Sequence, residues 1–268
     1  MPFGWKTDFF PQAPGSPAPE PIAAGVPLGS VIPWQLVDSP EIVLRSASRT
    51  VAAEKFRRLR TLLEHDERGA PRVIAVTSAL PREGKSLIAL NLALAFASDR
   101  KSETVLVDAD LRRPAVERWL TRKPGVGLSE VLAEKATLDH ALVHVKDSFL
   151  HVLAAGRPPR DPVELLASDR LSELVGKLKD RYQRVIMDTP PIVPFTDADV
   201  VGRTADGILI VVREGQTPRT LCEQAVSAVT STRILGAVLN DAVSNLADRD
   251  RYYGRYYDHY YGPGKKGK

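Results

Sequence analysis

Residues 78–86, Ser-Ala-Leu-Pro-Arg-Glu-Gly-Lys-Ser, decide the fold expected for this chain. They follow the apolar run 73–76 and precede the mostly apolar stretch 87–96, which is the strand, loop and helix order of a phosphate-binding loop. Backbone N–H groups turn inward in such a loop, and the start of the helix adds positive potential. We therefore expect Lys85 to reach the β- and γ-phosphates of a nucleotide and Ser86 to ligate Mg²⁺. An ordinary turn is the alternative, since Ala79 replaces the usual first glycine.

Two later strands that end in aspartate strengthen this interpretation. Residues 104–107 lead into Asp108 and Asp110, and residues 184–187 lead into Asp188. Ligands of open α/β sheets bind at the carboxyl ends of parallel strands. Asp108 and Asp110 there suit an Mg²⁺–water shell or proton acceptance from a hydroxyl, and Asp188 fits the Walker B carboxylate that holds a metal-bound water.

The rest of the chain alternates predicted strands with predicted helices. Strands are expected at 150–155, 207–213 and 235–240, and helices at 40–64, 126–145 (two short ones), 163–179 and 221–230. This alternation predicts an α/β fold, a P-loop NTPase-type three-layer sandwich with a mostly parallel central sheet. The single domain would span residues 41–246. A flexible Pro-, Ala- and Gly-rich arm, residues 1–40, would precede it, and a tail, residues 247–268, would follow.

Composition limits the possible partners and location. A chain of 268 residues can bury a core without disulfides, and the lone Cys222, in a helical pattern, is interpreted as a small core residue. A net charge of +4 with interspersed charges does not indicate a nucleic-acid surface. No stretch approaches the roughly 20 apolar residues of a membrane span, and no signal-peptide pattern begins the chain. We expect a cytoplasmic protein that reaches a membrane only through a partner.

Two further patterns lie outside the predicted nucleotide site. Six of the seven tyrosines fall within residues 252–261, beyond the last predicted strand, where they complete no core; a sticky or membrane-surface tail is the alternative interpretation. Glu54, Arg57 and Arg60 recur every three residues, so they share one helix face. That face is either a solvated charged stripe or an ion-pair surface between subunits.

Together, these features resemble the bacterial tyrosine kinases of capsule and exopolysaccharide synthesis, the cytosolic autokinase type. The resemblance covers about residues 41–244 and the tail. Residues 108–114, Asp-Ala-Asp-Leu-Arg-Arg-Pro, look like the family's second Walker A element, and residues 185–191 look like its Walker B element. Glu54, Arg57 and Arg60 match the E-x-x-R-x-x-R oligomerisation motif, and the tyrosine pairs match the autophosphorylated cluster.

The resemblance implies an ATP- and Mg²⁺-dependent protein-tyrosine autokinase that regulates polymerisation and export of a polysaccharide. Catalytic roles would fall to Lys85, Asp108, Asp110 and Asp188, with one aspartate of the second Walker A element activating the tyrosine hydroxyl. Mg²⁺ would be held by Ser86, Asp110 and Asp188. Nucleotide contacts would come from Pro81, Arg82, Glu83, Gly84, Lys85, Ser86, Leu87 and, for adenine, Asn240. The phosphoacceptors, modified in trans, would be Tyr252, Tyr253, Tyr256, Tyr257, Tyr260 and Tyr261.

The same resemblance implies several partners. Unphosphorylated copies would form a homo-oligomeric ring, a transmembrane chain-length determinant (polysaccharide co-polymerase) would activate the kinase at the inner face of the plasma membrane, and a tyrosine phosphatase would reverse the modification. The Thr-Ala-flanked Asp197 also follows the family pattern, but no chemical role is assigned to it. No nucleic-acid partner is expected.

Two departures from the family pattern bear on activity. The family usually has Gly where Arg82 stands and Thr where Leu87 stands. A non-glycine residue at 82 is restricted if that position needs a positive φ, although Arg82 could itself contact phosphate. Two alternative functions remain: a partition or division-site ATPase, which would usually carry a lysine at the position of Leu80 and no tyrosine tail, and a nucleotide-binding regulator without catalysis.

Overall fold

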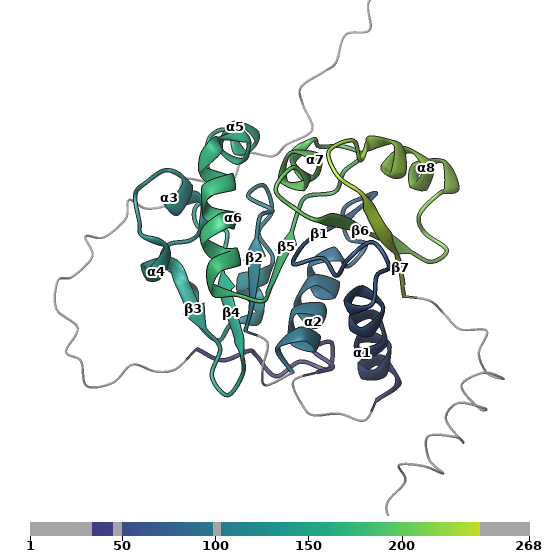
Figure 1. The fold of residues 1–268 in the computed structure, drawn as a ribbon, viewed down its shortest axis with the longest axis horizontal. Coiled ribbons are helices and arrows are strands. Elements are labelled where there is room, and N and C mark those ends of the chain that lie inside the picture. The colour runs from purple at the N-terminus through teal and green to yellow at the C-terminus, as the bar shows by residue number, and fades with distance from the viewer. Residues whose placement is uncertain (1–33, 45–49, 99–102, 242–268) are drawn as a thin grey trace, which may run out of the picture. The chain divides into compact units, whose positions relative to one another are not determined.

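The computed structural model describes residues 34–44, 50–98 and 103–241 (Figure 1). Within these residues one seven-stranded sheet has the order β3-β4-β2-β5-β1-β6-β7. Neighbouring strands are parallel, except that β3 runs antiparallel to β4. The strands are β1 (Val73–Ser78), β2 (Thr104–Asp108), β3 (Leu142–His144), β4 (Leu150–Leu153), β5 (Arg184–Asp188), β6 (Gly207–Arg213) and β7 (Ile234–Asn240).

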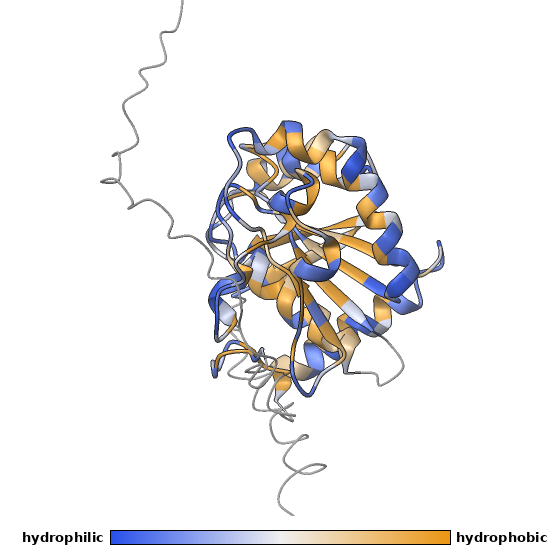
Figure 2. Ribbon diagram, turned by 90° about the vertical axis from the view of Figure 1, so that its left-hand side faces the viewer, coloured by the Kyte–Doolittle hydropathy of each residue, from blue (hydrophilic) through white to orange (hydrophobic). Residues whose placement is uncertain are grey.

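Helices cover both faces of this sheet, which confirms the predicted three-layer P-loop NTPase-type sandwich. Alternate residues of each central strand face opposite cores, as Val73 and Ile74 of β1 do, so the strands read as nearly continuous apolar runs. Figure 2 shows the strands mainly orange between helices whose outer sides are blue. The helices are α1 (Val51–Glu64), α2 (Lys85–Ala97), α3 (Leu128–Leu132), α4 (Leu138–Ala141), α5 (Pro162–Ala167), α6 (Asp169–Arg181), α7 (Asp197–Gly202) and α8 (Arg219–Ala228), with a 3-10 helix at Val116–Trp119.

The helix that follows the phosphate-binding loop is almost completely enclosed. Every residue of α2 except Leu87 is buried, and Leu87 itself packs on the core of that face. The amphipathic α1 lies against α2, and it begins at Thr50, whose hydroxyl accepts a hydrogen bond from Ala53 N at 3.2 Å. The predicted start at residue 40 is therefore too early, because the helix begins at this cap.

Three other sequence expectations differ from the structure. The expected helix 163–179 is two helices separated at Ser168, which is extended (ψ 151°) and whose hydroxyl donates to Leu165 O at 2.7 Å. Residues 142–144 form the edge strand β3 rather than the end of a helix, because they pair with β4. The packed chain also starts before residue 41: Leu36 is 4% exposed in the α2-side core, and Trp34 forms a bridge with Val145.

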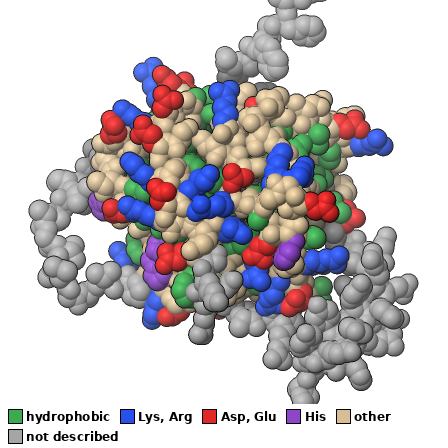
Figure 3. All heavy atoms as spheres, viewed as in Figure 1, with side chains coloured by type: hydrophobic (Ala, Val, Ile, Leu, Met, Phe, Trp, Pro, Cys, Tyr) green, Lys and Arg blue, Asp and Glu red, His purple; other side chains and the backbone are tan. Residues whose placement is uncertain are grey.

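Residues 1–33 of the predicted arm and residues 242–268, which include the whole predicted tail with its tyrosine cluster, lie outside the described residues. Cys222, on α8, is half-buried. In the part of the chain that is described, no helix combines the length and apolar character needed to span a bilayer. On the face shown in Figure 3, basic and acidic side chains are interspersed.

Candidate active site

The chemistry-bearing residues meet at the carboxyl ends of three adjacent strands. β1, which leads into the phosphate-binding loop, pairs with β5, and β5 pairs with β2. Asp108 and Asp188 are direct register partners across β2 and β5. Residues separated by long stretches of sequence are therefore brought to one edge of the sheet, as the motifs predicted.

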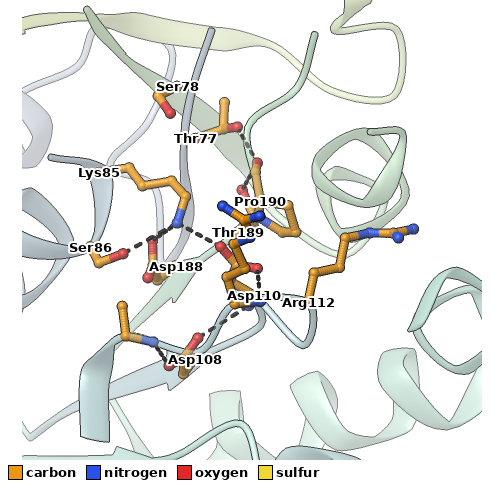
Figure 4. A network of polar contacts seen from close by, with 12 residues as sticks. Thr77, Ser78, Lys85, Ser86, Asp108, Asp110, Arg112, Asp188, Thr189 and Pro190 are labelled. Carbon is orange, nitrogen blue, oxygen red and sulfur yellow. Dashed lines mark hydrogen bonds and ion pairs between the residues drawn. The ribbon is translucent and has the colours of Figure 1, made fainter. Parts of the chain in front are cut away.

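Lys85 is the centre of the polar network drawn in Figure 4. Its Nζ donates to Asp110 Oδ2 at 2.7 Å and to Ser86 Oγ at 3.2 Å, and it lies 3.6 Å from Asp188 Oδ1. Burial by itself lowers the pKa of Lys85, but the charges of Asp188 and Asp110 outweigh it and raise the pKa. Lys85 is therefore a buried, charged ammonium group facing the loop's ligand side.

Asp108 is engaged mainly with the backbone of its own loop. Its Oδ2 accepts N–H groups of Ala115 and Val116 at 3.0 and 2.9 Å, and its Oδ1 accepts Asp110 N at 3.2 Å. Burial, followed by the charge of Asp188, raises the pKa of Asp108 to about 8. The carboxyl of Asp108 thus fixes the shape of the loop that carries Asp110.

Asp188 has the opposite surroundings. It is fully buried, yet neither carboxylate oxygen has a hydrogen-bond partner of normal geometry among the described residues. Burial raises the pKa of Asp188 to about 6, although the nearby Lys85 lowers it in part. A buried carboxylate without close hydrogen-bond donors is costly, and only the Lys85 ammonium, 3.6 Å away, offsets the charge of Asp188. Asp188 is therefore the least satisfied carboxylate of this site.

The backbone of the phosphate-binding loop has a positive φ at two positions, Arg82 and Gly84. Gly84 has a φ of 92°, and a Cβ there would lie 2.1 Å from Asn240 Nδ2, so any other residue would be strained and would displace the Asn240 side chain. Arg82 has a φ of 68° and an exposed side chain, which confirms that position 82 needs a positive φ. A non-glycine residue pays about 1–2 kcal/mol for this conformation, so the loop that Arg82 occupies is held by its surroundings.

Glu83 and Asn240 contact the loop's own backbone. The Glu83 side chain is 4% exposed, and its carboxylate accepts Leu80 N at 2.8 Å and the hydroxyl of Thr217. Asn240 Nδ2 donates to Glu83 O at 2.9 Å. Thr217 was not found from the sequence, because no motif marks a threonine that reaches a loop more than a hundred residues away.

A second ion pair joins the β2 and β5 loops. Arg112 Nε lies 2.9 Å from Asp197 Oδ1, and the guanidinium stacks on the ring of Phe195 at 4.4 Å from its centroid. Asp197 is fully buried, and its Oδ2 has no hydrogen-bond partner among the described residues. The arginine explains why this acid is tolerated inside the fold, although sequence reasoning assigned it no role.

The residues predicted for oligomerisation lie on α1 with partners in the same chain. Arg57 forms an ion pair with Glu54 within the helix. Arg60 Nη1 donates to Ala95 O of α2 at 3.0 Å, and its Nε lies 3.6 Å from Glu64. Arg60 therefore holds α1 against α2, and a contact of this face with another subunit stays a prediction.

The fold and the site define a P-loop protein with two aspartate-bearing strands beside its phosphate-binding loop. Tyrosine-protein kinase YwqD of Bacillus subtilis is 34% identical over 216 residues, which cover 80% of this chain and 91% of that protein. The chain belongs to the bacterial tyrosine-protein kinases. This membership removes the support for a partition or division-site ATPase.

Two other similarities extend the comparison. Succinoglycan biosynthesis transport protein ExoP of Rhizobium meliloti is 33% identical over 231 residues, which cover 80% of this chain but only 29% of ExoP. The solved kinase domain of Escherichia coli tyrosine kinase ETK is 31% identical with a TM-score of 0.69, covering 75% of this chain and 79% of that one. No protein-family model matches the chain.

Proposed function

We propose that this kinase transfers the γ-phosphate of ATP to the tail tyrosines, residues 252–261, of a neighbouring copy. The observation that carries the proposal is Lys85, a charged group held by Asp110 and Asp188 where the phosphate-binding loop opens. Binding of a nucleotide phosphate would give this ammonium a further anionic partner. The loop's N–H groups and Lys85 together would bind and orient the phosphates.

We propose Mg²⁺ as the cofactor, held by Ser86, Asp110 and Asp188. The unpartnered oxygens of Asp188 are the observation that fits a cation, and carboxylate and hydroxyl oxygens are ligands that Mg²⁺ favours. Among the described residues no cluster of three or more His, Cys, Asp or Glu side chains could hold a metal. This is compatible with Mg²⁺, which usually takes one or two carboxylates and completes its shell with water and phosphate oxygens. When bound, the ion supplies charge neutralisation for phosphoryl transfer.

The hydroxyl proton of the incoming tyrosine needs an acceptor as its oxygen bonds to phosphorus and the bond to ADP breaks. Either Asp108 or Asp110 could accept it. Asp108 accepts only backbone N–H groups. Asp110 accepts Arg113 N on Oδ1 at 2.9 Å, but its Oδ2 faces Lys85 within the site. The geometry therefore favours Asp110 as the proton acceptor.

A mixing experiment tests autophosphorylation and its route. A Lys85→Met chain with an intact tail is incubated with Mg·ATP and an active chain whose six tail tyrosines are phenylalanine. We expect phosphotyrosine on the Lys85→Met chain, detected by antibody and mass spectrometry, and none when that chain is incubated alone. Absence of phosphotyrosine in the wild type would favour the non-catalytic regulator, and wild-type labelling without labelling in the mixture would argue against transfer in trans.

We also propose a role in polymerisation and export of a capsular or exopolysaccharide, at the inner face of the plasma membrane. The similarity to one part of a much longer succinoglycan transport protein supports it. A separate transmembrane chain-length determinant would supply the membrane contact and activate the kinase, and a tyrosine phosphatase would reverse the modification. The test is the phosphorylation rate with the cytoplasmic segment of such a partner fused to the chain; no increase with any candidate partner would contradict activation.

The unphosphorylated protein is proposed to form a ring through the face bearing Glu54, Arg57 and Arg60. A repeated head-to-tail contact forms a ring when its rotation closes. Each phosphate adds about −1.5 to −2 charges to a crowded tail, and repulsion between the tails would disperse the ring. Light scattering should show a large unphosphorylated assembly and phosphorylated monomers. A Glu54→Ala, Arg57→Ala, Arg60→Ala triple variant with the wild-type mass would exclude this face. An unphosphorylated wild type that stays monomeric, with and without its partner, would exclude the ring.

A further inference from the structure

The outer side of the phosphate-binding loop is contacted by residues from the β6–β7 edge of the sheet. Asn240, the last residue of β7, donates through Nδ2 to Glu83 O at 2.9 Å. Arg213, the last residue of β6, donates through Nη1 to Arg82 O at 3.4 Å. Thr217, which precedes α8, donates its hydroxyl to the carboxylate of Glu83. We call Arg213, Thr217 and Asn240 the loop brace.

Two of these bonds set the direction of consecutive peptide planes. In a trans peptide the carbonyl of one residue and the N–H of the next point in opposite directions. Because the carbonyls of Arg82 and Glu83 are bonded on the outer side by the brace, the N–H groups of Glu83 and Gly84 are turned to the other side. A phosphate-binding loop needs this arrangement, since its inward N–H groups are the anion ligands.

The third bond controls a charge that would otherwise oppose phosphate. Glu83 places a nearly buried carboxylate in an anion-binding loop. Leu80 N and the Thr217 hydroxyl both donate hydrogen bonds to that carboxylate. The Thr217 oxygen in turn accepts a hydrogen bond from Arg213 N at 3.0 Å. The bond from Leu80 to Glu83 closes the turn that contains Arg82, which has a positive φ. The brace thus orients the acid and stabilises the strained turn together.

We propose that Thr217 and Arg213 are positioning residues of the kinase reaction. They hold the loop ready for nucleotide phosphates and compensate for the absence of glycine at position 82. This inference rests on the proposed binding of ATP. Without the brace the competent loop would be only partly populated, and apparent affinity falls by that fraction. Once the nucleotide has ordered the loop, the chemical step should be little changed.

The main test compares Thr217→Val, which removes the hydroxyl at nearly constant shape, with Thr217→Ser, which keeps it. The full chain is titrated with a fluorescent ATP analogue and Mg²⁺, and phosphotyrosine formation is measured against ATP concentration. For Thr217→Val we expect about a tenfold rise in Kd and in KM for ATP with kcat within about threefold. Thr217→Ser should stay within about twofold. Unchanged Kd and KM in Thr217→Val, with wild-type binding intact, would overturn the inference. A wild type that binds no nucleotide would instead refute the proposed function.

A second pair of variants keeps the test decisive if Thr217→Val does not fold. Arg213→Met removes the donor to Arg82 O, whereas Asp241→Asn weakens only the outer ion pair of Arg213 with Asp241, 2.6 Å in the structure. Arg213→Met should raise the Kd about three- to tenfold and Asp241→Asn less than twofold. Equal effects of the two variants would count against the brace, because the carbonyl contact would then be irrelevant.

The link to Arg82 is tested by repeating Thr217→Val in an Arg82→Gly background. Glycine adopts positive φ without the penalty of a side chain, so the effect on Kd should fall to about threefold or less. An undiminished tenfold effect would overturn the claim that the brace compensates for Arg82. Thermal unfolding of each variant confirms that the binding measurements are made on folded protein.

Discussion

Asp188→Asn should abolish phosphorylation while making the nucleotide-free protein more stable. Two buried carboxylates, Asp110 and Asp188, share one buried ammonium, Lys85. Asp188 is the member whose oxygens have no hydrogen bonds among the described residues. Asparagine has nearly the same shape and removes a buried charge that Lys85 offsets only in part, so the free fold gains stability. The same change removes the carboxylate proposed to hold Mg²⁺, so activity is lost.

The size of this effect follows from the pKa of Asp188, which is raised to about 6 from an ordinary value of 3.8. Because the folded state holds the proton more tightly, stability falls as pH rises from about 4 to about 6, and the full cost is present above pH 6. Two pKa units correspond to about 3 kcal/mol. Asp188→Asn should therefore gain up to about 3 kcal/mol at pH 7.5 and roughly half of that at pH 5.

Thermal unfolding of the nucleotide-free protein at the two pH values measures this gain, which should be about 6–12 °C in Tm at pH 7.5. Asp199→Asn is a matched control, for which the expected change in stability has the opposite sign. Burial acts to raise the pKa of Asp199, but hydrogen bonds from Thr230 and Ser231 lower it overall, so asparagine there should destabilise. A Tm of Asp188→Asn at or below that of the wild type at pH 7.5, or a gain independent of pH, would refute the reasoning. So would a phosphorylation rate close to that of the wild type.

Three further changes test other parts of the structure. Lys85→Met should abolish phosphotyrosine and destabilise the nucleotide-free fold by about 3–5 kcal/mol, because Asp110 and Asp188 lose their buried partner; a stable or active variant would contradict this. Tyr182→Phe should leave phosphotyrosine unchanged by mass spectrometry, since Tyr182 is 5% exposed, and phosphate found on Tyr182 of the wild type would contradict it. Burial, followed by the charge of His144, lowers the pKa of His151 below 6.5, so stability should fall as pH drops through about 6.5; His151→Leu should flatten that dependence in urea unfolding, and an unchanged slope would contradict it.

The positions of the phosphate-binding loop and of the aspartates could be predicted from the sequence, whereas the residues that brace the loop could not. The phosphate-binding loop and the aspartates at the ends of β2 and β5 are local patterns next to apolar runs, and parallel strands necessarily bring their carboxyl ends together. Thr217 and Arg213 carry no local pattern, because their contacts with the loop depend on the place of β6 beside β1. The sequence showed only that Arg82 would be restricted if position 82 had a positive φ. The backbone of the structure shows that it does.

Element boundaries were missed where tertiary contacts decided them. The apolar period continues through Ser168, yet the chain is extended there and two helices result. Residues 142–144 form a strand because β4 offers them a pairing edge. The segment from Trp34 packs against the core although its composition is that of an arm, because Leu36 forms a bridge with Leu120 and is buried in the same apolar core. None of these three boundaries can be predicted from a short stretch of neighbouring residues.

The position of β1 in the sheet has a consequence for synthesis. β1 is paired on both sides by strands that begin at Arg184 and Gly207, and the loop after it is contacted by Asn240. On the ribosome, the loop emerges long before any of these partners, and non-local strand pairing must wait for them. A chain released before residue 240 would lack the residue against which Gly84 packs. We therefore expect nascent and truncated chains to be unable to bind nucleotide, so that kinase activity begins only when nearly the entire domain has been translated.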